Sequence, residues 1–165
     1  MHLVTPAAHR RAAFLELAAD YEAAGELRYA SALQDFDAYV RRLEAGRRGD
    51  GLPHGWIPEA TFWLASKGAL LGCARLRLGL SPQLEYEGGH IGYDVRPSMR
   101  RRGHGTTLLR LVLIEARALA IERVRITCDD DNFGSIRVIE RNGGVLADMG
   151  VSEASGKPLR QYWIG

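Results

Sequence analysis

Residues 95–107 have the types and spacing of an anion-binding turn. The segment reads Val-Arg-Pro-Ser-Met-Arg-Arg-Arg-Gly-His-Gly-Thr-Thr, with three arginines directly before Gly103-His-Gly105. A strand pattern stops at Pro97, and a helix pattern begins near the two glycines. The first turn of a helix has unpaired backbone N–H groups and the positive end of the helix dipole, so it attracts anions. Because glycines let a phosphate approach those N–H groups, the segment predicts a diphosphate site.

Three known phosphate-binding patterns can be compared with this segment. A P-loop requires a lysine after its second glycine, and no lysine follows here. A dinucleotide fold requires a third glycine, where this chain has Leu108, and an early βαβ unit. The pattern that fits is Arg-x-x-Gly-x-Gly after a strand ending in Val-x-Pro, at Val95, Pro97 and Arg100. An ordinary glycine turn with surface arginines is the structural alternative.

A second segment, after the next strand, adds to the evidence from residues 95–107. Asn132-x-x-Ser135 follows a strand ending in Thr-Cys-Asp at residues 127–129, and Ile-Glu-Arg-Asn-Gly follows at 139–143. With both segments at this spacing, the chain resembles the GNAT superfamily of N-acetyltransferases over nearly its whole length. The stretch 88–98 and the final Tyr-Trp-Ile at 162–164 are similar to a bacterial branch of predicted acetyltransferases.

The resemblance implies a coenzyme site. Acetyl-coenzyme A would be the cosubstrate, and Val95 would hydrogen-bond its pantetheine as an added strand, with its N–H at a strand bulge facing the thioester oxygen. Asn132 and Ser135 would contact the coenzyme, although Asn132 also suits a plain helix N-cap. The turn that would bind the diphosphate consists of Arg100, Arg101, Arg102, Gly103, His104, Gly105 and Thr106.

Direct attack of an amine on the thioester requires a base for the ammonium proton. His90 is the first candidate, because an unperturbed imidazole pKa of about 6.5 suits deprotonation near neutrality; a structural histidine is the alternative. Asp94 is the second candidate, and its alternative is an ion pair with Arg96 or a nearby arginine. The family often has a tyrosine acid where this chain has Ile139, so Tyr93 or Tyr162 would have to replace it, or water would supply the proton.

The acceptor is expected to be a primary amine, bound by the first two helices, the loop 46–58 and the loop between the last two strands. Carboxylates and aromatic faces attract a cationic amine. The candidates with such side chains are Trp56, Glu59, Glu85, Tyr86 and Glu87.

The elements that position these residues are predicted by periodicity. Two helices precede the loop at 46–58, one capped at Thr5-Pro6 and one by a capping box at Ser31-x-x-Gln34. Strands 60–66, 69–80 and 89–95 follow, then helix 105–120, strand 122–128, helix 132–142 and strands 144–152 and 159–164. The expected fold is one α/β domain over residues 1–165, a mixed, mostly antiparallel twisted sheet flanked by helices, in the order β-α-α-β-β-β-α-β-α-β-β.

Composition narrows the class of protein. The 165 residues include 22 basic and 20 acidic side chains, a net charge of +2 that does not suit a general polyanion binder. Two cysteines, Cys73 and Cys128, predict reduced buried thiols and a cytoplasmic protein. We expect no membrane segment, no metal site and no nucleic-acid partner; two copies could pair through sheet edges, as family members often do. The alternative to an enzyme is a non-catalytic acyl-coenzyme-A sensor or interaction domain of the same fold.

Overall fold

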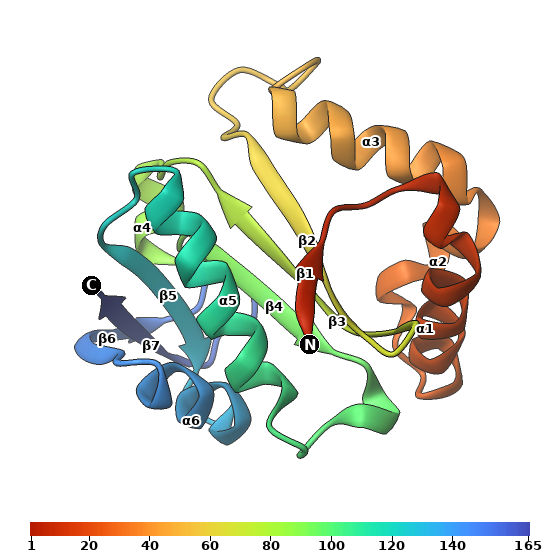
Figure 1. The fold of residues 1–165 in the computed structure, drawn as a ribbon. Helices are drawn as coiled ribbons and strands as arrows, with labels where there is room; N and C mark the ends of the chain where they lie inside the picture. The colour runs from red at the N-terminus through yellow and green to blue at the C-terminus, as the bar shows by residue number, and fades with distance from the viewer.

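The structure, a computed structural model, describes residues 1–165 and has the expected order of main elements (Figure 1). The strands are β1 (His2–Val4), β2 (Glu59–Ser66), β3 (Ala69–Arg77), β4 (Ile91–Val95), β5 (Val124–Asp129), β6 (Val145–Val151) and β7 (Pro158–Ile164). The helices are α1 (Arg11–Ala23), α2 (Ala30–Gln34), α3 (Phe36–Arg48), α4 (Pro82–Tyr86), α5 (His104–Ala118) and α6 (Phe133–Arg141). Single 3-10 turns lie at Ala8–Arg10, Leu27–Tyr29 and Pro97–Met99.

The strands form two antiparallel sheets instead of one continuous sheet. The first has the order β1-β2-β3-β4, and the second has the order β5-β7-β6, with the last strand of the chain in its centre. No strand ladder joins β4 to β5. The gap between these two strands is the structural feature on which the site depends.

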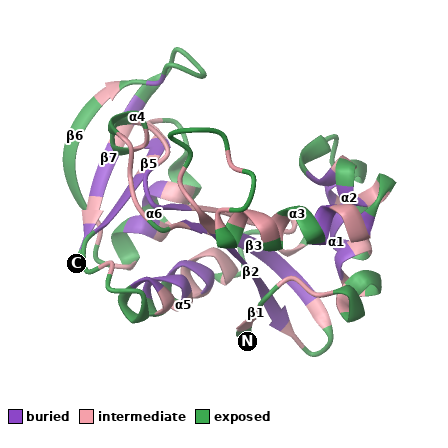
Figure 2. Ribbon diagram, turned by 90° about the horizontal axis from the view of Figure 1, so that it is seen from above, coloured by how far each residue is buried: buried purple, intermediate pink, exposed green.

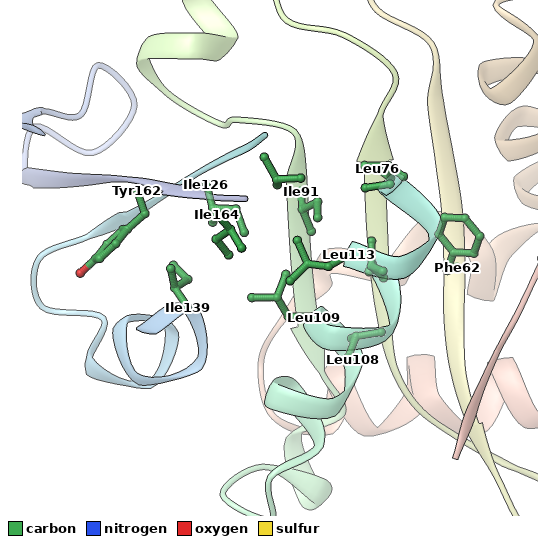
Figure 3. Packing of buried hydrophobic residues seen from close by; sticks show 14 of the residues in the cluster. Phe62, Leu76, Ile91, Leu108, Leu109, Leu113, Ile126, Ile139, Tyr162 and Ile164 are labelled. Carbon is green, nitrogen blue, oxygen red and sulfur yellow. The ribbon is translucent and has the colours of Figure 1, made fainter. Parts of the chain in front are cut away.

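Two hydrophobic cores hold the layers together. The larger core packs α5 and α6 against one face of both sheets, through residues such as Leu109, Ile126 and Ile139 (Figure 3). The second core packs α1–α3 against the other face of β2 and β3, around Phe14 and Trp63. Strand alternation explains both, because Ala74 and Leu76 point into the first core while Cys73 points into the second. Figure 2 shows the buried residues concentrated in the central strands and the exposed ones on β6 and the loops.

Three local expectations fail for physical reasons. The capping box at Ser31 is wrong, because Asp35 caps α3 by accepting the N–H of Ala38 and divides the expected helix into α2 and α3. Helix α1 begins at Arg11 and not at the Thr5-Pro6 cap, because a 3-10 turn comes first. The strand bulge expected at Val95 is also wrong, because the β3–β4 register runs without a shift from Leu76↔Ile91 to Gly72↔Val95.

None of the helices combines the length and the apolar character needed to span a bilayer. Both cysteines are free and buried.

Candidate functional site

The turn before α5 presents a run of unpaired backbone donors. The N–H groups of residues 101–106 donate to no acceptor in the protein, and the first bond of the helix is Thr107 N–H to Gly103 O at 3.1 Å. Nδ1 of His104 in the same turn is buried and has no partner. These donors, at the positive end of a 15-residue helix, suit a ligand with several anionic oxygens.

The two glycines of this turn have different tasks. Gly103 has φ +81°, in the left-handed region, and a Cβ built there meets no atom within 4 Å. Gly105 instead allows helix packing, because its Cβ would lie 3.2 Å from Cγ2 of Val138 on α6. Only Gly103 therefore fits the expectation that a glycine opens the turn to a phosphate, and Gly105 brings α6 close to α5.

The arginines of the turn divide into two engaged and two free side chains. Arg100 pairs with Glu26 at 2.7 Å, and its Nε donates to the carbonyl of Val95 at 3.1 Å. Arg96 pairs with Asp20 at 3.2 Å, a carboxylate that also accepts Ser98 N–H and Oγ–H. Burial raises the pKa of Asp20, but the Ser98 and Arg96 hydrogen bonds outweigh that effect and leave the pKa lowered.

The free pair is Arg101 and Arg102. Both side chains are exposed and have no hydrogen-bond or ion-pair partner. The positive charge available to an anion at this turn therefore comes from these two residues. Arg100 instead connects the turn to Val95 of β4 and to Glu26, which follows α1.

The edge of β4 that faces β5 has an open hydrogen-bonding ladder. Arg77 N–H donates to His90 O and Arg96 N–H donates to Leu71 O, which sets the alternation of the β3–β4 ladder. By that alternation the N–H and C=O groups of Tyr93 and the N–H of Val95 point away from β3, toward the gap, while the Val95 carbonyl accepts Nε–H of Arg100. An extended ligand could pair with them as an additional strand.

His90 lies where the two sheets meet. The backbone N–H of His90 donates to the backbone O of Arg125 at 2.8 Å, and Nδ1 of the His90 ring accepts the backbone N–H of Arg125 at 2.9 Å. Gly89 permits this approach, because it has φ +64° and a Cβ there would lie 2.3 Å from Arg125 O. Burial, with the charge of Arg77, lowers the pKa of His90.

This bonding pattern opposes the prediction that His90 is the base. A neutral imidazole has one acceptor nitrogen, and in His90 that nitrogen already accepts the Arg125 N–H. Taking a proton would break the bond that joins the sheets. His90 also lies outside the lining of the two main cavities.

A cavity of about 330 Å³ occupies the gap between β4 and β5. On the side of α6 it is lined by Tyr93, Cys128, Asn132 and Ser135. The hydroxyl groups of Tyr93 and Ser135 lie 2.8 Å apart, and burial raises the pKa of Tyr93 and raises that of Cys128 to about 11. Both groups are therefore neutral near pH 7 and act as hydrogen-bonding groups there.

Asn132 is the N-cap of α6, which is the structural alternative expected from the sequence. Its Oδ1 accepts the N–H of Ser135 at 3.0 Å, while the side chain also lines the gap cavity. The structure thus brings Asn132 and Ser135 together with Tyr93 around the gap cavity, whereas Val95, two residues after Tyr93 on β4, does not line it.

Asp94 is bound by four neighbours. Its Oδ1 accepts hydrogen bonds from Tyr21 and Tyr29 at 2.6 and 2.7 Å, and its Oδ2 lies 3.4 Å from Arg75 and 3.8 Å from Arg28. The expected ion pair therefore forms with these two arginines and not with Arg96. Both oxygens of the carboxylate therefore already accept hydrogen bonds, from Tyr21, Tyr29 and Arg75, and Asp94 keeps these side chains in place.

The residues predicted for the acceptor do not form one cluster. Trp56 and Glu59 line a separate cavity of about 510 Å³ beneath the loop after α3, where Glu59 pairs with Arg77 at 3.4 Å. Glu87 lines the gap cavity, and its carboxylate accepts Ser152 Oγ–H and Glu153 N–H from the β6–β7 loop. Tyr86 also contacts β6, through Val151.

Two arginines of the gap cavity, Arg28 and Arg75, were not singled out from the sequence. The signal for Arg75 was present, because it is a charged residue that alternates with buried apolar residues along a strand. Arg28 has no such pattern, because it lies in a 3-10 turn whose place beside β4 only the fold reveals.

No cluster of three or more His, Cys, Asp or Glu side chains in the chain could hold a metal ion.

Comparison with known proteins identifies a family model that matches most of the chain. The model of the acetyltransferase (GNAT) family matches residues 14–144. No curated protein sequence matches the chain.

Several solved structures share the fold. The acetyltransferase that modifies the N-terminal serine of a 50S ribosomal subunit protein in Salmonella typhimurium is 16% identical, with a TM-score of 0.69 over 98% of this chain and 92% of that one. RimJ from Mycobacterium smegmatis, in complex with CoA-disulfide, is 17% identical, with a TM-score of 0.74 over 98% and 80%. The microcin C7 self-immunity acetyltransferase MccE, in complex with acetyl-CoA and AMP, is 14% identical, with a TM-score of 0.72 over 98% and 89%.

Proposed function

This chain belongs to the acetyltransferase (GNAT) family, and on that premise we propose that it transfers an acetyl group from acetyl-coenzyme A to a primary amine in a ternary complex. The observation that carries the proposal is the run of unpaired N–H groups at residues 101–106 beside the open edge of β4. Neighbours of the same fold were solved with acetyl-CoA or a CoA-disulfide. In our proposal the diphosphate binds the amides of that turn, assisted by Arg101 and Arg102.

The pantetheine arm then enters the gap between the sheets. We propose that it pairs with the backbone of Tyr93 and Val95 and that Asn132 and Ser135 contact it from α6. Val95 N–H, which has no partner in the protein, would face the thioester oxygen and stabilise the negative charge that develops there.

Proton transfer is assigned differently from the expectation based on sequence. Since Nδ1 of His90 and the carboxylate of Asp94 are already occupied by donors, we propose that water at the open cavity takes the ammonium proton. Tyr93 lines the cavity, and its raised pKa makes it a hydrogen-bond donor to the departing sulfur and a poor proton source. Tyr162 does not suit that role, because its hydroxyl points away from α5 and contacts Glu140 and Arg160 (Figure 3).

The second candidate function is a non-catalytic sensor of acyl-coenzyme A. It is favoured by Ile139, which is fully buried at the position of the family's usual tyrosine, and by His90, whose acceptor nitrogen is already occupied. The two functions differ in turnover and not in coenzyme binding.

Thiol release during a screen of amines separates the two functions. The enzyme proposal predicts release with at least one amine, and His90→Ala and Asp94→Ala test the roles of those residues. Because water is the proposed proton acceptor, kcat/KM of Asp94→Ala should keep the wild-type dependence on pH. Binding of acetyl-CoA without release on any amine would favour the sensor.

We also propose that the protein acts in the cytoplasm and that two copies pair through β6. The free thiols of Cys73 and Cys128 support the first point. The second is supported by the position of β6 at the edge of its sheet, where Val145 is 69% exposed. Sedimentation equilibrium that gives a monomer mass at micromolar concentration would contradict the pairing.

A further inference from the structure

The gap cavity has walls of opposite charge. Arg28, from the 3-10 turn after α1, and Arg75, from β3, line one side, while Glu87 and Asp129 line the other. The residues expected to contact the coenzyme, Tyr93 and Ser135 among them, line the same cavity. A molecule that meets the thioester in this gap therefore lies between a basic and an acidic wall.

The basic wall has unused hydrogen-bonding capacity. The only acid within ion-pair distance of Arg28 and Arg75 is Asp94, so two positive charges share one negative charge. Each guanidinium has five N–H donors, yet Arg75 makes one hydrogen bond, to Asp94, and Arg28 makes none. The Arg28 and Arg75 side chains are 46% and 27% exposed, so both are accessible to a ligand.

Arg75 is held in place beside the reactive strand. The guanidinium packs over Gly92 of β4, because a Cβ built there would lie 3.4 Å from Nη2 of Arg75, an ordinary contact distance. Tyr21 and Tyr29 fix Asp94 from the opposite side, at its other oxygen. The guanidinium is thus fixed directly against the strand that faces the gap.

The acidic wall is also fixed. The two carboxylate oxygens of Glu87 are held by Ser152 and Glu153 of the β6–β7 loop, and Oδ1 of Asp129 accepts Ser155 Oγ–H at 3.4 Å. Neither carboxylate is paired with a cation. They remain negative charges toward which an ammonium group can orient.

We propose that the acetyl acceptor is a small zwitterion, a primary amine that also has a carboxylate group, as in an amino acid. Arg28 and Arg75 bind the carboxylate, and Glu87 and Asp129 attract the ammonium before it loses its proton. The cavity volume of about 330 Å³, shared with the thioester end of the coenzyme, suits an acceptor of small size. This inference rests on the proposed acetyl transfer and narrows its substrate.

Matched acceptors test the proposal. Initial rates of thiol release from acetyl-CoA are measured with an amino acid, its amide and the corresponding decarboxylated amine, which differ only in the anionic group. We expect kcat/KM for the amino acid to exceed both others by at least about tenfold, the loss expected for one hydrogen bond to a charged group. An aminophosphonate of the same side chain tests the anion, and a preference for it over the carboxylate would contradict the proposal.

Variants test the assignment of the basic wall. In Arg28→Gln and Arg75→Gln, the ratio of kcat/KM for the amino acid to kcat/KM for its amide should fall toward one, mainly because KM for the amino acid rises. Arg110→Gln, on the exposed face of α5, should keep the wild-type ratio. Thermal melting and acetyl-CoA affinity identify a variant that has not folded, and Arg28, the more exposed of the two, keeps the test decisive if Arg75→Gln fails to fold.

The outcomes separate the two levels of the proposal. Thiol release with equal or higher kcat/KM for the amide, or an unchanged preference in Arg28→Gln, would overturn the zwitterion proposal alone. No release with any amine would overturn the proposed acetyl transfer and the zwitterion proposal with it.

Discussion

Replacing Gly103 by alanine tests whether the turn before α5 binds the diphosphate. Gly103 has φ +81°, and a Cβ there meets no protein atom within 4 Å, so an added methyl group can collide only with a ligand. Gly68, in the β2–β3 turn, is a matched control, because it has φ +83° and equally open surroundings. Both alanine variants therefore carry the same backbone strain, and only Gly103 borders the unpaired amides.

The expected effects on stability and binding differ in size. A left-handed conformation costs an L-residue about 1–2 kcal/mol, which for a domain of this length lowers Tm by roughly 2–8 °C. If the methyl group displaces the diphosphate from even one amide, about 1.5–3 kcal/mol of binding free energy is lost. That loss corresponds to a Kd that rises by about 10- to 150-fold.

Calorimetric titration with acetyl-CoA and thermal melting of both variants provide the measurements. We expect similar Tm values for Gly103→Ala and Gly68→Ala, with weakened binding in Gly103→Ala alone. Wild-type affinity in Gly103→Ala, or an equal loss of affinity in both variants, would refute the placement of the diphosphate at this turn.

Three further changes test other parts of the structure. Gly89→Ala should lower the free energy of unfolding by more than about 2 kcal/mol in a urea titration, because its Cβ would lie 2.3 Å from Arg125 O at a φ of +64°; an unchanged midpoint would contradict this. The lowered pKa of His90 means that the unfolded chain binds a proton more readily, so stability should fall as pH decreases below about 6.5, and His90→Gln should have a flatter pH dependence. Tyr93→Phe should reduce kcat by about 10-fold or more with little change in acetyl-CoA affinity, whereas Tyr162→Phe should retain kcat; equal kcat in both variants would exclude a role for the Tyr93 hydroxyl.

The arrangement of elements could be predicted because it depends on local patterns. Helix α5 and strands β5 and β7 each follow the apolar spacing of their own residues, and the observed bounds lie within a few residues of the expected ones. The capping box failed because two polar residues competed to begin a helix, and Asp35, four residues after Ser31, captured the N–H of Ala38.

The partners of the site residues could not be predicted, because they lie far apart in sequence. Asp94 is bound by Tyr21 and Tyr29, which are 73 and 65 positions away, and Asp20 reaches Arg96 over 76 positions. The distance between such residues is set by how α1 packs on the first sheet. For the same reason the sequence indicated that His90 could be a base but not that Arg125, 35 positions later, would occupy its acceptor nitrogen.

The separation of β4 from β5 was the other hidden feature. One mixed, mostly antiparallel sheet was the expectation, yet the β4 ladder stays open on one side after the junction at His90. An unpaired strand edge inside a fold leaves backbone groups that need partners. In our account the pantetheine arm of the coenzyme supplies the hydrogen-bonding partners of the β4 edge when it binds.

The most direct test of this account is a calorimetric titration of the wild-type protein with acetyl-CoA, repeated with S-acetyl-pantetheine, which lacks the diphosphate. We predict saturable binding of acetyl-CoA at one site per chain, an accompanying rise in Tm, and much weaker binding of S-acetyl-pantetheine. No heat and no change in Tm at saturating acetyl-CoA, or equal affinity for the two ligands, would contradict the account.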